Sequence, residues 1–104
     1  MGAEQLKGHL DGLVLASLAG APAHGYRVIE ELRARSGGVF DLPEGTVYPV
    51  LHRLERDGLL ASGWTTVSGR RRRVYRLTRR GRTALDARRR EWRSVAHAVE
   101  ASLA

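Results

Sequence analysis

The fold of this chain is indicated by the stretch Val67-Ser68-Gly69-Arg70-Arg71-Arg72-Arg73-Val74-Tyr75, in which four consecutive arginines follow a Ser-Gly pair. A two-residue turn at Ser-Gly predicts an antiparallel β-hairpin with a cationic tip. In that register Val67 pairs with Arg70, and Trp64 lies opposite Arg73, where a cation–π contact is feasible. Four like charges repel one another at a hairpin tip unless a polyanion lies nearby, so this stretch favours contact with nucleic acid.

The alternation of the two strands predicts that one face of the hairpin is apolar. Leu60, Trp64, Tyr75 and Leu77 share that face. Arg71 and Arg73 lie on the same side but toward the tip, whereas Arg70 and Arg72 lie on the other side. We therefore expect Trp64 to pack in the core or at a hinge.

A helix is predicted just before the hairpin, from Gly45 to Asp57. At about 100° per residue, its apolar stripe is made by Val47, Val50, Leu51 and Leu54. The outward side carries Tyr48, Pro49, His52, Arg53 and Arg56. Because Pro49 is tolerated only near a helix start, we expect the first turn around Glu44 to Thr46, with Gly45 or Thr46 as the N-cap. A helix that fits a DNA groove, followed by a cationic ribbon, describes a winged helix-turn-helix.

Other helices complete a mostly α-helical fold with one small antiparallel hairpin. The first is expected from about residue 5 to 19, on the spacing of Leu6, Leu10, Leu13, Val14 and Leu18. The second is expected to start near Gly25 and to stop at Ser36-Gly37-Gly38. Its inward residues are predicted to be Tyr26, Ile29 and Leu32. The last helix is expected to begin after Thr78, its N-cap, and to end near Ser102.

The last helix is expected to have about 25 residues and to span about 37 Å. This is longer than the compact body of a 104-residue chain requires, so its end is expected to protrude. A stripe close to a heptad repeat runs along it, made by Leu85, Trp92, Val95, Ala96, Val99 and Leu103. Such a stripe on a protruding helix needs another helix to cover it, and a second copy of this chain is the simplest cover. We expect residues 1–78 to form the DNA-binding part and residues 79–104 the dimerisation helix of one compact unit.

Positive charge is concentrated in the C-terminal third of the chain. The formal net charge is +7, from 18 basic and 11 acidic residues. Residues 1–69 hold six Lys or Arg and eight Asp or Glu, whereas residues 70–104 hold twelve Arg and three acids. This clustering predicts binding to a polyanion, and the lack of helix-inserted aromatic residues or leucines beside the arginine run disfavours a membrane surface.

Several classes of function lack their characteristic residues. The chain has no Cys, so disulfides and thiolate metal sites are excluded. His9, His24, His52 and His97 are scattered without an i, i+4 pair, so no metal or other cofactor is expected. Neither a Gly-rich phosphate loop nor a Ser-His-acid arrangement is visible, so we do not expect an enzyme. The absence of a secretory leader and of a membrane span predicts a cytoplasmic protein.

Five short motifs lie between residues 13 and 81. They are Leu13-Val14-Leu15, His24-Gly25-Tyr26, Glu44-Gly45-Thr46-Val47-Tyr48-Pro49-Val50-Leu51-His52-Arg53-Leu54-Glu55, Asp57-Gly58-Leu59-Leu60 and Tyr75-Arg76-Leu77-Thr78-Arg79-Arg80-Gly81. Together they resemble the PadR family of bacterial transcriptional regulators, over roughly residues 6–85. The resemblance implies a homodimeric winged-helix repressor of the short form, which has a single C-terminal helix.

The resemblance also implies which residues touch DNA. The recognition helix would present Thr46, Tyr48, Pro49, His52 and Arg53, and the wing would present Gly69, Arg70, Arg71, Arg72 and Arg73. Arg53 has the fork to read a guanine edge, His52 can donate to a base or a phosphate, and Tyr48 can donate its hydroxyl to a phosphate. The four-arginine wing and the Arg88-Arg89-Arg90 run depart from the more lysine-rich family pattern, which bears on affinity.

Members of this family release DNA when a small molecule binds, often a phenolic acid or a multi-ring cation. In the drug-sensing branch a tryptophan of the C-terminal helix stacks on the ligand at the dimer centre, and Trp92 is placed to match it. We expect Trp92 to lie in the dimer seam first and to offer a platform for a small aromatic effector second.

The hypothesis for function is a sequence-specific DNA-binding transcriptional regulator, acting as a ligand-responsive repressor. It would bind a pseudo-palindromic operator with helix 44–57 in the major groove and wing 67–74 on the phosphates. The rival hypotheses are a winged-helix protein-interaction module without DNA readout, a protein that binds a ligand at the seam, and an RNA-binding protein. Few exposed aromatic residues are predicted to stack on unpaired bases, which disfavours RNA.

Overall fold

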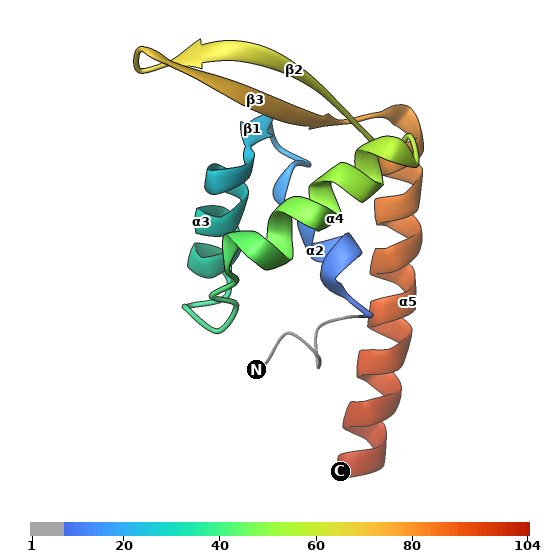
Figure 1. The fold of residues 1–104 in the computed structure, drawn as a ribbon. Coiled ribbons are helices and arrows are strands. Elements are labelled where there is room, and N and C mark those ends of the chain that lie inside the picture. The colour runs from blue at the N-terminus through green and yellow to red at the C-terminus, as the bar shows by residue number, and fades with distance from the viewer. Residues whose placement is uncertain (1–7) are drawn as a thin grey trace.

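The computed structural model describes residues 8–104 and contains four helices and one three-stranded sheet in that range (Figure 1). The elements in chain order are α2 (Leu10–Ser17), β1 (Ala23–His24), α3 (Gly25–Arg35), α4 (Glu44–Arg56), β2 (Leu60–Val67), β3 (Arg70–Leu77) and α5 (Arg79–Leu103). A helical cluster followed by a hairpin and a long helix confirms the predicted winged helix-turn-helix with a C-terminal helix.

The core lies among α2, α3 and α4, with the base of the hairpin and the start of α5 closing it. The predicted stripe of α4 is confirmed, because Val47, Val50, Leu51 and Leu54 are all buried. Full burial of one such side chain contributes roughly 1.5–3 kcal/mol, so this stripe is a main anchor of α4.

The first described helix is shorter than predicted. Gly8 and His9 form a turn, and the helix runs only over Leu10–Ser17. The predicted beginning of this helix, including Leu6, lies outside the described residues. Within the described part, Val14 and Leu18 are buried as expected from the apolar spacing.

Two local predictions for α3 and α4 are wrong. In α3 the inward residues include Val28 and Leu32, whereas Tyr26 is exposed, because the buried stripe follows i, i+4 from Val28. The N-cap of α4 is Pro43 rather than Gly45 or Thr46. The extended backbone of Pro43 leads into the helix, and its carbonyl accepts from the amides of Thr46 and Val47 at 3.0 and 3.2 Å.

The end of α4 is tied to the start of α5 by tight backbone contacts. Gly58 has a φ of +80°, and the Leu59 amide donates to the Leu54 carbonyl, which closes α4 in a Schellman motif. Thr78 caps α5 by accepting from the Gly81 amide, as predicted, and its hydroxyl donates to the Gly58 carbonyl. A Cβ on Gly81 would lie 2.0 Å from the Leu59 carbonyl oxygen, so only glycine fits at this junction.

The register of the hairpin is confirmed, with Val67 opposite Arg70 and Trp64 opposite Arg73. Ser68 and Gly69 both have positive φ, +51° and +76°, as a type I′ turn requires. The sheet has a third strand that the sequence did not predict, since β1 pairs with β3 and gives the order β1-β3-β2. A strand of two residues, Ala23–His24, is too short to show the alternation that predicts a strand. It forms because its backbone pairs with the free edge of β3.

Helix α5 runs along α2 and then extends beyond the body of the molecule (Figure 1). The described chain measures 52 × 28 × 21 Å, and its radius of gyration is 14.5 Å. A compact globule of this length has a radius of gyration of about 13 Å, so the difference reflects the projecting helix.

Candidate nucleic-acid interface

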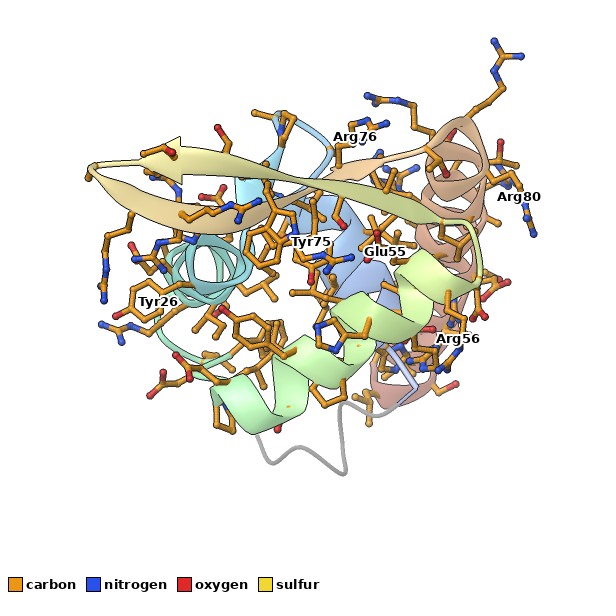
Figure 2. All side chains as sticks on the ribbon, turned by 45° about the horizontal axis from the view of Figure 1, so that its top comes forward. Tyr26, Glu55, Arg56, Tyr75, Arg76 and Arg80 are labelled. Carbon is orange, nitrogen blue, oxygen red and sulfur yellow. The ribbon has the colours of Figure 1, made fainter. Side chains whose placement is uncertain are left out.

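The outward face of α4 is a narrow strip of exposed side chains. On each side of the strip, a charged residue of α4 pairs with another element of the chain. Pro49, His52 and Arg56 are exposed there, opposite the buried stripe. Arg56 has no ion pair among the described residues, and Figure 2 shows it near the C-terminal end of α4. The sequence-based site omitted Arg56, although its place on the helical wheel puts it on the same strip as His52.

Tyr48 and Thr46 are only half-buried and lie at the edges of that strip. The Tyr48 ring packs so closely on α3 that a Cβ on Gly25 would lie 2.7 Å from it. Its centroid lies 6.3 Å from that of His52. Gly25 therefore allows α3 and α4 to approach, and the Tyr48 ring and hydroxyl are held against the start of α3.

Arg53 lies on the flank of α4 that faces α2. Its Nη1 and Nη2 donate to the two carboxylate oxygens of Asp11, at 3.0 and 2.6 Å. The hydrogen bond from Arg53 holds the pKa of Asp11 below its usual range, and the same bond raises the pKa of Arg53. The predicted guanine contact of Arg53 stays a prediction, and the fork that it would use is engaged within the chain.

The opposite flank of α4 is joined to the hairpin. Glu55 accepts from the Ser62 hydroxyl at 2.5 Å and from Arg73 Nη2 at 3.2 Å. Arg73 also donates from Nε to the Ser62 hydroxyl at 2.8 Å. One arginine of the wing therefore fixes the hairpin against α4. Figure 2 shows Glu55 between α4 and the sheet.

The predicted packing of Trp64 in the core is wrong. Its side chain is 59% exposed, because β2 is exposed from Gly63 onward, where the hairpin extends past the body. The guanidinium carbons of Arg71 and Arg73 lie 5.1 and 5.7 Å from the Trp64 ring centroid, which confirms the predicted cation–π pair with Arg73 and adds a second one.

The remaining wing arginines are directed away from Trp64. Arg70 is exposed at the turn, and Arg72 is half-buried on the opposite face of the hairpin. Gly69 supplies the positive φ of the turn between them and Val67. The wing thus presents cationic groups on both faces, and its tip projects past α3, away from α5 (Figure 1).

His24 joins the wing to the N-terminus of α3. Its Nδ1 accepts from the Arg27 amide at 3.2 Å and caps α3, while its backbone pairs with Val74 in β3. Burial lowers the pKa of His24, and the positive charge of Arg72 lowers it further. The residues of β1 were not predicted to have this role, because histidine is not among the residue types preferred as helix N-caps.

The apolar stripe of α5 is largely uncovered within one chain. Trp92, Val95, Val99 and Leu103 are exposed, and Ala96 is half-buried. Leu85 differs, because it is 3% exposed in the core of its own chain. The place of Leu85 in the dimer interface stays a prediction, and little of its surface is left for a partner.

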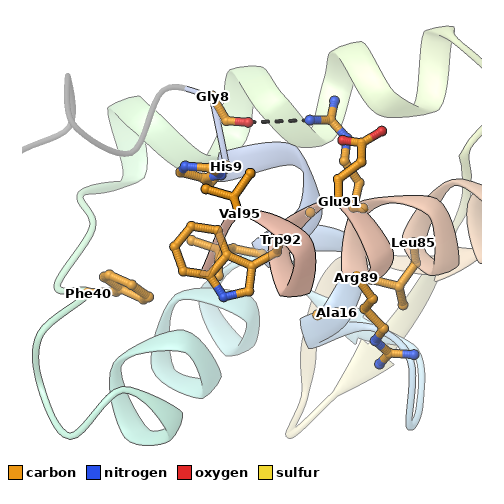
Figure 3. A pocket seen from close by; sticks show the side chains of 12 residues that line it. Gly8, His9, Ala16, Phe40, Leu85, Arg89, Glu91, Trp92 and Val95 are labelled. Atoms are coloured by element: carbon orange, nitrogen blue, oxygen red, sulfur yellow. Dashed lines mark hydrogen bonds between the residues drawn. The ribbon is translucent and has the colours of Figure 1, made fainter. Parts of the chain in front are cut away.

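A cavity of about 520 Å³ opens where α5 crosses α2 (Figure 3). Its wall is made mainly by apolar groups, including Trp92, Val95, Leu13 and Phe40. The His9 ring meets the Trp92 ring edge-on, with centroids 4.9 Å apart. Trp92, predicted as a ligand platform, therefore lies beside a cavity of the size that small ligands occupy.

Within residues 8–104, no group of three or more His, Asp or Glu side chains is placed to hold a metal ion. Over the same range, no helix combines the length and apolarity that crossing a membrane requires.

The exposed strip of α4 beside an arginine-rich wing defines the class of protein as a winged helix-turn-helix protein with a cationic surface. Residues 14–87 match the family described as PadR-like transcriptional regulators. The chain belongs to this family, whose members are transcriptional regulators and not enzymes.

Known relatives agree with that assignment. The chain is 45% identical over 86 residues to the transcriptional regulator Rv3488 of Mycobacterium tuberculosis, covering 83% of this chain and 78% of the relative. A PadR family regulator from Eggerthella lenta is 34% identical with a TM-score of 0.80, and the match covers 96% of this chain and 86% of that one. A PadR family regulator from Clostridium difficile is 31% identical, also at 0.80, over 92% and 99% of the two chains.

Proposed function

We propose that this PadR-like regulator is a homodimeric repressor that binds a pseudo-palindromic site in duplex DNA. Each α4 would lie in a major groove with Thr46, Tyr48, Pro49, His52 and Arg56 toward the bases and phosphates. Each wing would place Arg70, Arg71 and Arg72 on the adjacent backbone. Two-fold symmetry would space the two half-sites by about one helical turn, roughly 34 Å.

The observation that carries this proposal is the pairing of an exposed strip on α4 with an adjacent arginine hairpin. Residues 70–104 hold twelve Arg and three acids, so the cationic surface belongs to the wing and to α5. The wing supplies charge without sequence information, whereas the exposed side chains of α4 are of types that reach base edges. A protein-interaction module would need neither this charge nor this adjacency.

The wing is tested by replacing Arg70 and Arg71 with Ala. Both specific and random duplexes should bind more weakly and by similar factors, because phosphate contacts carry no sequence information. The slope of log K against log salt should flatten by about one unit for each lost phosphate contact. Measurement requires a duplex first located by footprinting the DNA upstream of the protein's own gene, at two salt concentrations.

Arg33→Ala serves as the control, since Arg33 is exposed on α3 and pairs only weakly with Asp41 at 3.8 Å. It removes one positive charge, against two in the wing variant, from a surface outside the proposed interface. An unchanged salt slope in the wing variant, or an equal change in the control, would exclude the wing from DNA binding.

A second function, binding of a small aromatic effector, is favoured by the cavity beside Trp92. The apolar wall suits a flat ring system, and a partner's α5 would cover the open side in a dimer. A multi-ring aromatic cation should quench Trp92 fluorescence in a Trp64→Phe background, which removes the second tryptophan of the chain. If the fluorescence is not quenched, or if Val95→Asp leaves the quenching unchanged, this cavity is not the effector site.

A further inference from the structure

We infer that Asp11 is a positioning residue: it holds Arg53 as a brace between α2 and α4 and so fixes the angle at which α4 is presented to DNA. The inference rests on the proposed DNA binding. It replaces the expected guanine contact of Arg53 with a role inside the protein.

The geometry of the pair favours a brace. Both terminal nitrogens of Arg53 donate to the Asp11 carboxylate, at 3.0 and 2.6 Å, and the Asp11 side chain is only 20% exposed. Reading a guanine edge requires the same two-pronged fork, so Asp11 and a guanine compete for it. Releasing the fork would leave the partly buried carboxylate of Asp11 without its strongest partner, which is costly.

The position of Arg53 on the helix agrees with this role. At about 100° per residue, Arg53 lies roughly 65° from the centre of the strip formed by Pro49, His52 and Arg56, and Glu55 lies roughly 95° from it on the other side. Glu55 is paired with Arg73 of the wing. Ion pairs therefore hold α4 on both flanks, and the strip between them faces outward.

Asp11 also connects α4 to the C-terminal helix. Arg88 Nη2 of α5 lies 3.7 Å from Asp11 Oδ2, and Arg88 Nη1 donates to the Gly8 carbonyl at 3.3 Å (Figure 3). Arg88 lines the cavity beside Trp92. One carboxylate thus links α2, α4 and α5 at a point where the DNA-binding helix and the cavity wall meet.

The test is a double-mutant cycle on DNA affinity, with Asp11→Ala, Arg53→Ala and the double variant. A brace predicts that each single variant weakens binding to the footprinted duplex by about tenfold and that the double variant is no weaker than either single one. Independent roles would multiply the two losses to about 100-fold. Random duplex should bind each variant within about twofold of wild type, because the wing is unaltered and loss of the brace affects only the fit of α4.

Two further variants keep the test decisive. Asp86→Ala removes an exposed acid that pairs with Arg89 at 3.7 Å and should change neither affinity. Asp11→Asn preserves the shape of the side chain, so a loss of specific binding with an intact circular dichroism spectrum attributes the effect to the ion pair.

Arg53 as a base reader predicts the reverse. Asp11→Ala would then leave specific binding unchanged or tighten it, because the fork would be freed, and only Arg53→Ala would weaken it. That result overturns the inference, as does an equal loss on specific and random duplexes. If the wild-type protein protects no DNA, the proposed function fails separately. The brace is then tested by measuring the urea unfolding midpoints of Asp11→Ala, Arg53→Ala and the double variant. If the shifts of the two single variants add up in the double variant, the brace is overturned.

Discussion

The winged body (residues 8–85) and the distal half of α5 (residues 86–103) differ in whether their apolar side chains are buried within one chain. Every buried apolar side chain of residues 8–104 lies at or before Leu85, so the body completes its core within one chain. Beyond that point, Trp92, Val95, Val99 and Leu103 repeat along α5 and remain exposed. A stripe of this size on a projecting helix is stable in water only when something covers it.

The contrast separates two sources of stability. The body owes its stability to packing that does not depend on protein concentration. For the distal half of α5, whose apolar stripe is exposed, we propose that stability comes from association with a second copy of the chain. Substitutions in the two regions should therefore respond differently to dilution.

The largest effect is expected from Leu51→Ala in the body. Leu51 is fully buried, so its truncation should lower the free energy of unfolding by about 3 kcal/mol, from lost burial and the cavity left behind. Urea unfolding at two protein concentrations measures it, and the loss should be the same at both. Val99→Ala is the matched apolar truncation in α5, and its effect should grow with protein concentration. If the loss of stability is independent of protein concentration for both Leu51→Ala and Val99→Ala, the two regions do not differ in their source of stability.

A smaller effect, on association alone, is expected from Val95→Asp. A carboxylate placed in an apolar helix seam without a partner should weaken dimerisation by about 2 kcal/mol, or roughly thirtyfold in the dissociation constant. Sedimentation equilibrium measures this constant. Ser94→Asp adds the same charge on the opposite side of α5 and should leave it nearly unchanged. Equal behaviour of the two variants would show that this face of α5 is not the seam.

The smallest effect is expected from the histidine that caps α3. The pKa of His24 is lowered in the folded protein, so the folded state binds protons less readily than the unfolded state. Its contribution to stability is therefore complete above about pH 6.5 and declines as the pH falls below that value. The loss should be about 1 kcal/mol or less, the usual worth of an N-cap.

His24→Asn tests this expectation, because asparagine caps a helix but does not titrate. The variant should lose less stability than wild type between pH 7.5 and 5.5 in urea unfolding. His97→Asn on the exposed part of α5 is the control and should follow wild type. If both variants follow wild type, the cap does not respond to pH.

Much of the fold followed from residues near one another in the chain. The hairpin register, the buried stripe of α4 and the Thr78 cap each depend on local spacing or on a turn of two residues. The strand β1 and the exposure of Trp64 depend on where the hairpin lies relative to the body. Alternation along a strand identifies a face but not how far the body reaches along it.

The candidate site divides in the same way. The strip with His52 and the arginines of the wing could be predicted from angle and charge. The pairing of Arg53 with Asp11 joins residues 42 positions apart, and that of Arg73 with Glu55 joins residues 18 apart. A single acid in the otherwise uncharged helix α2 was the one signal for Asp11, and it did not indicate which residue would pair with it.

The amino-acid sequence alone determined the order of helices and strands, the faces of each and the concentration of positive charge near the wing, because these follow from periodicity and composition. Only the tertiary structure decided which arginines are engaged within the chain, that Leu85 belongs to the body, and that a cavity lies beside Trp92. These features depend on distances between elements, and packing in three dimensions sets those distances.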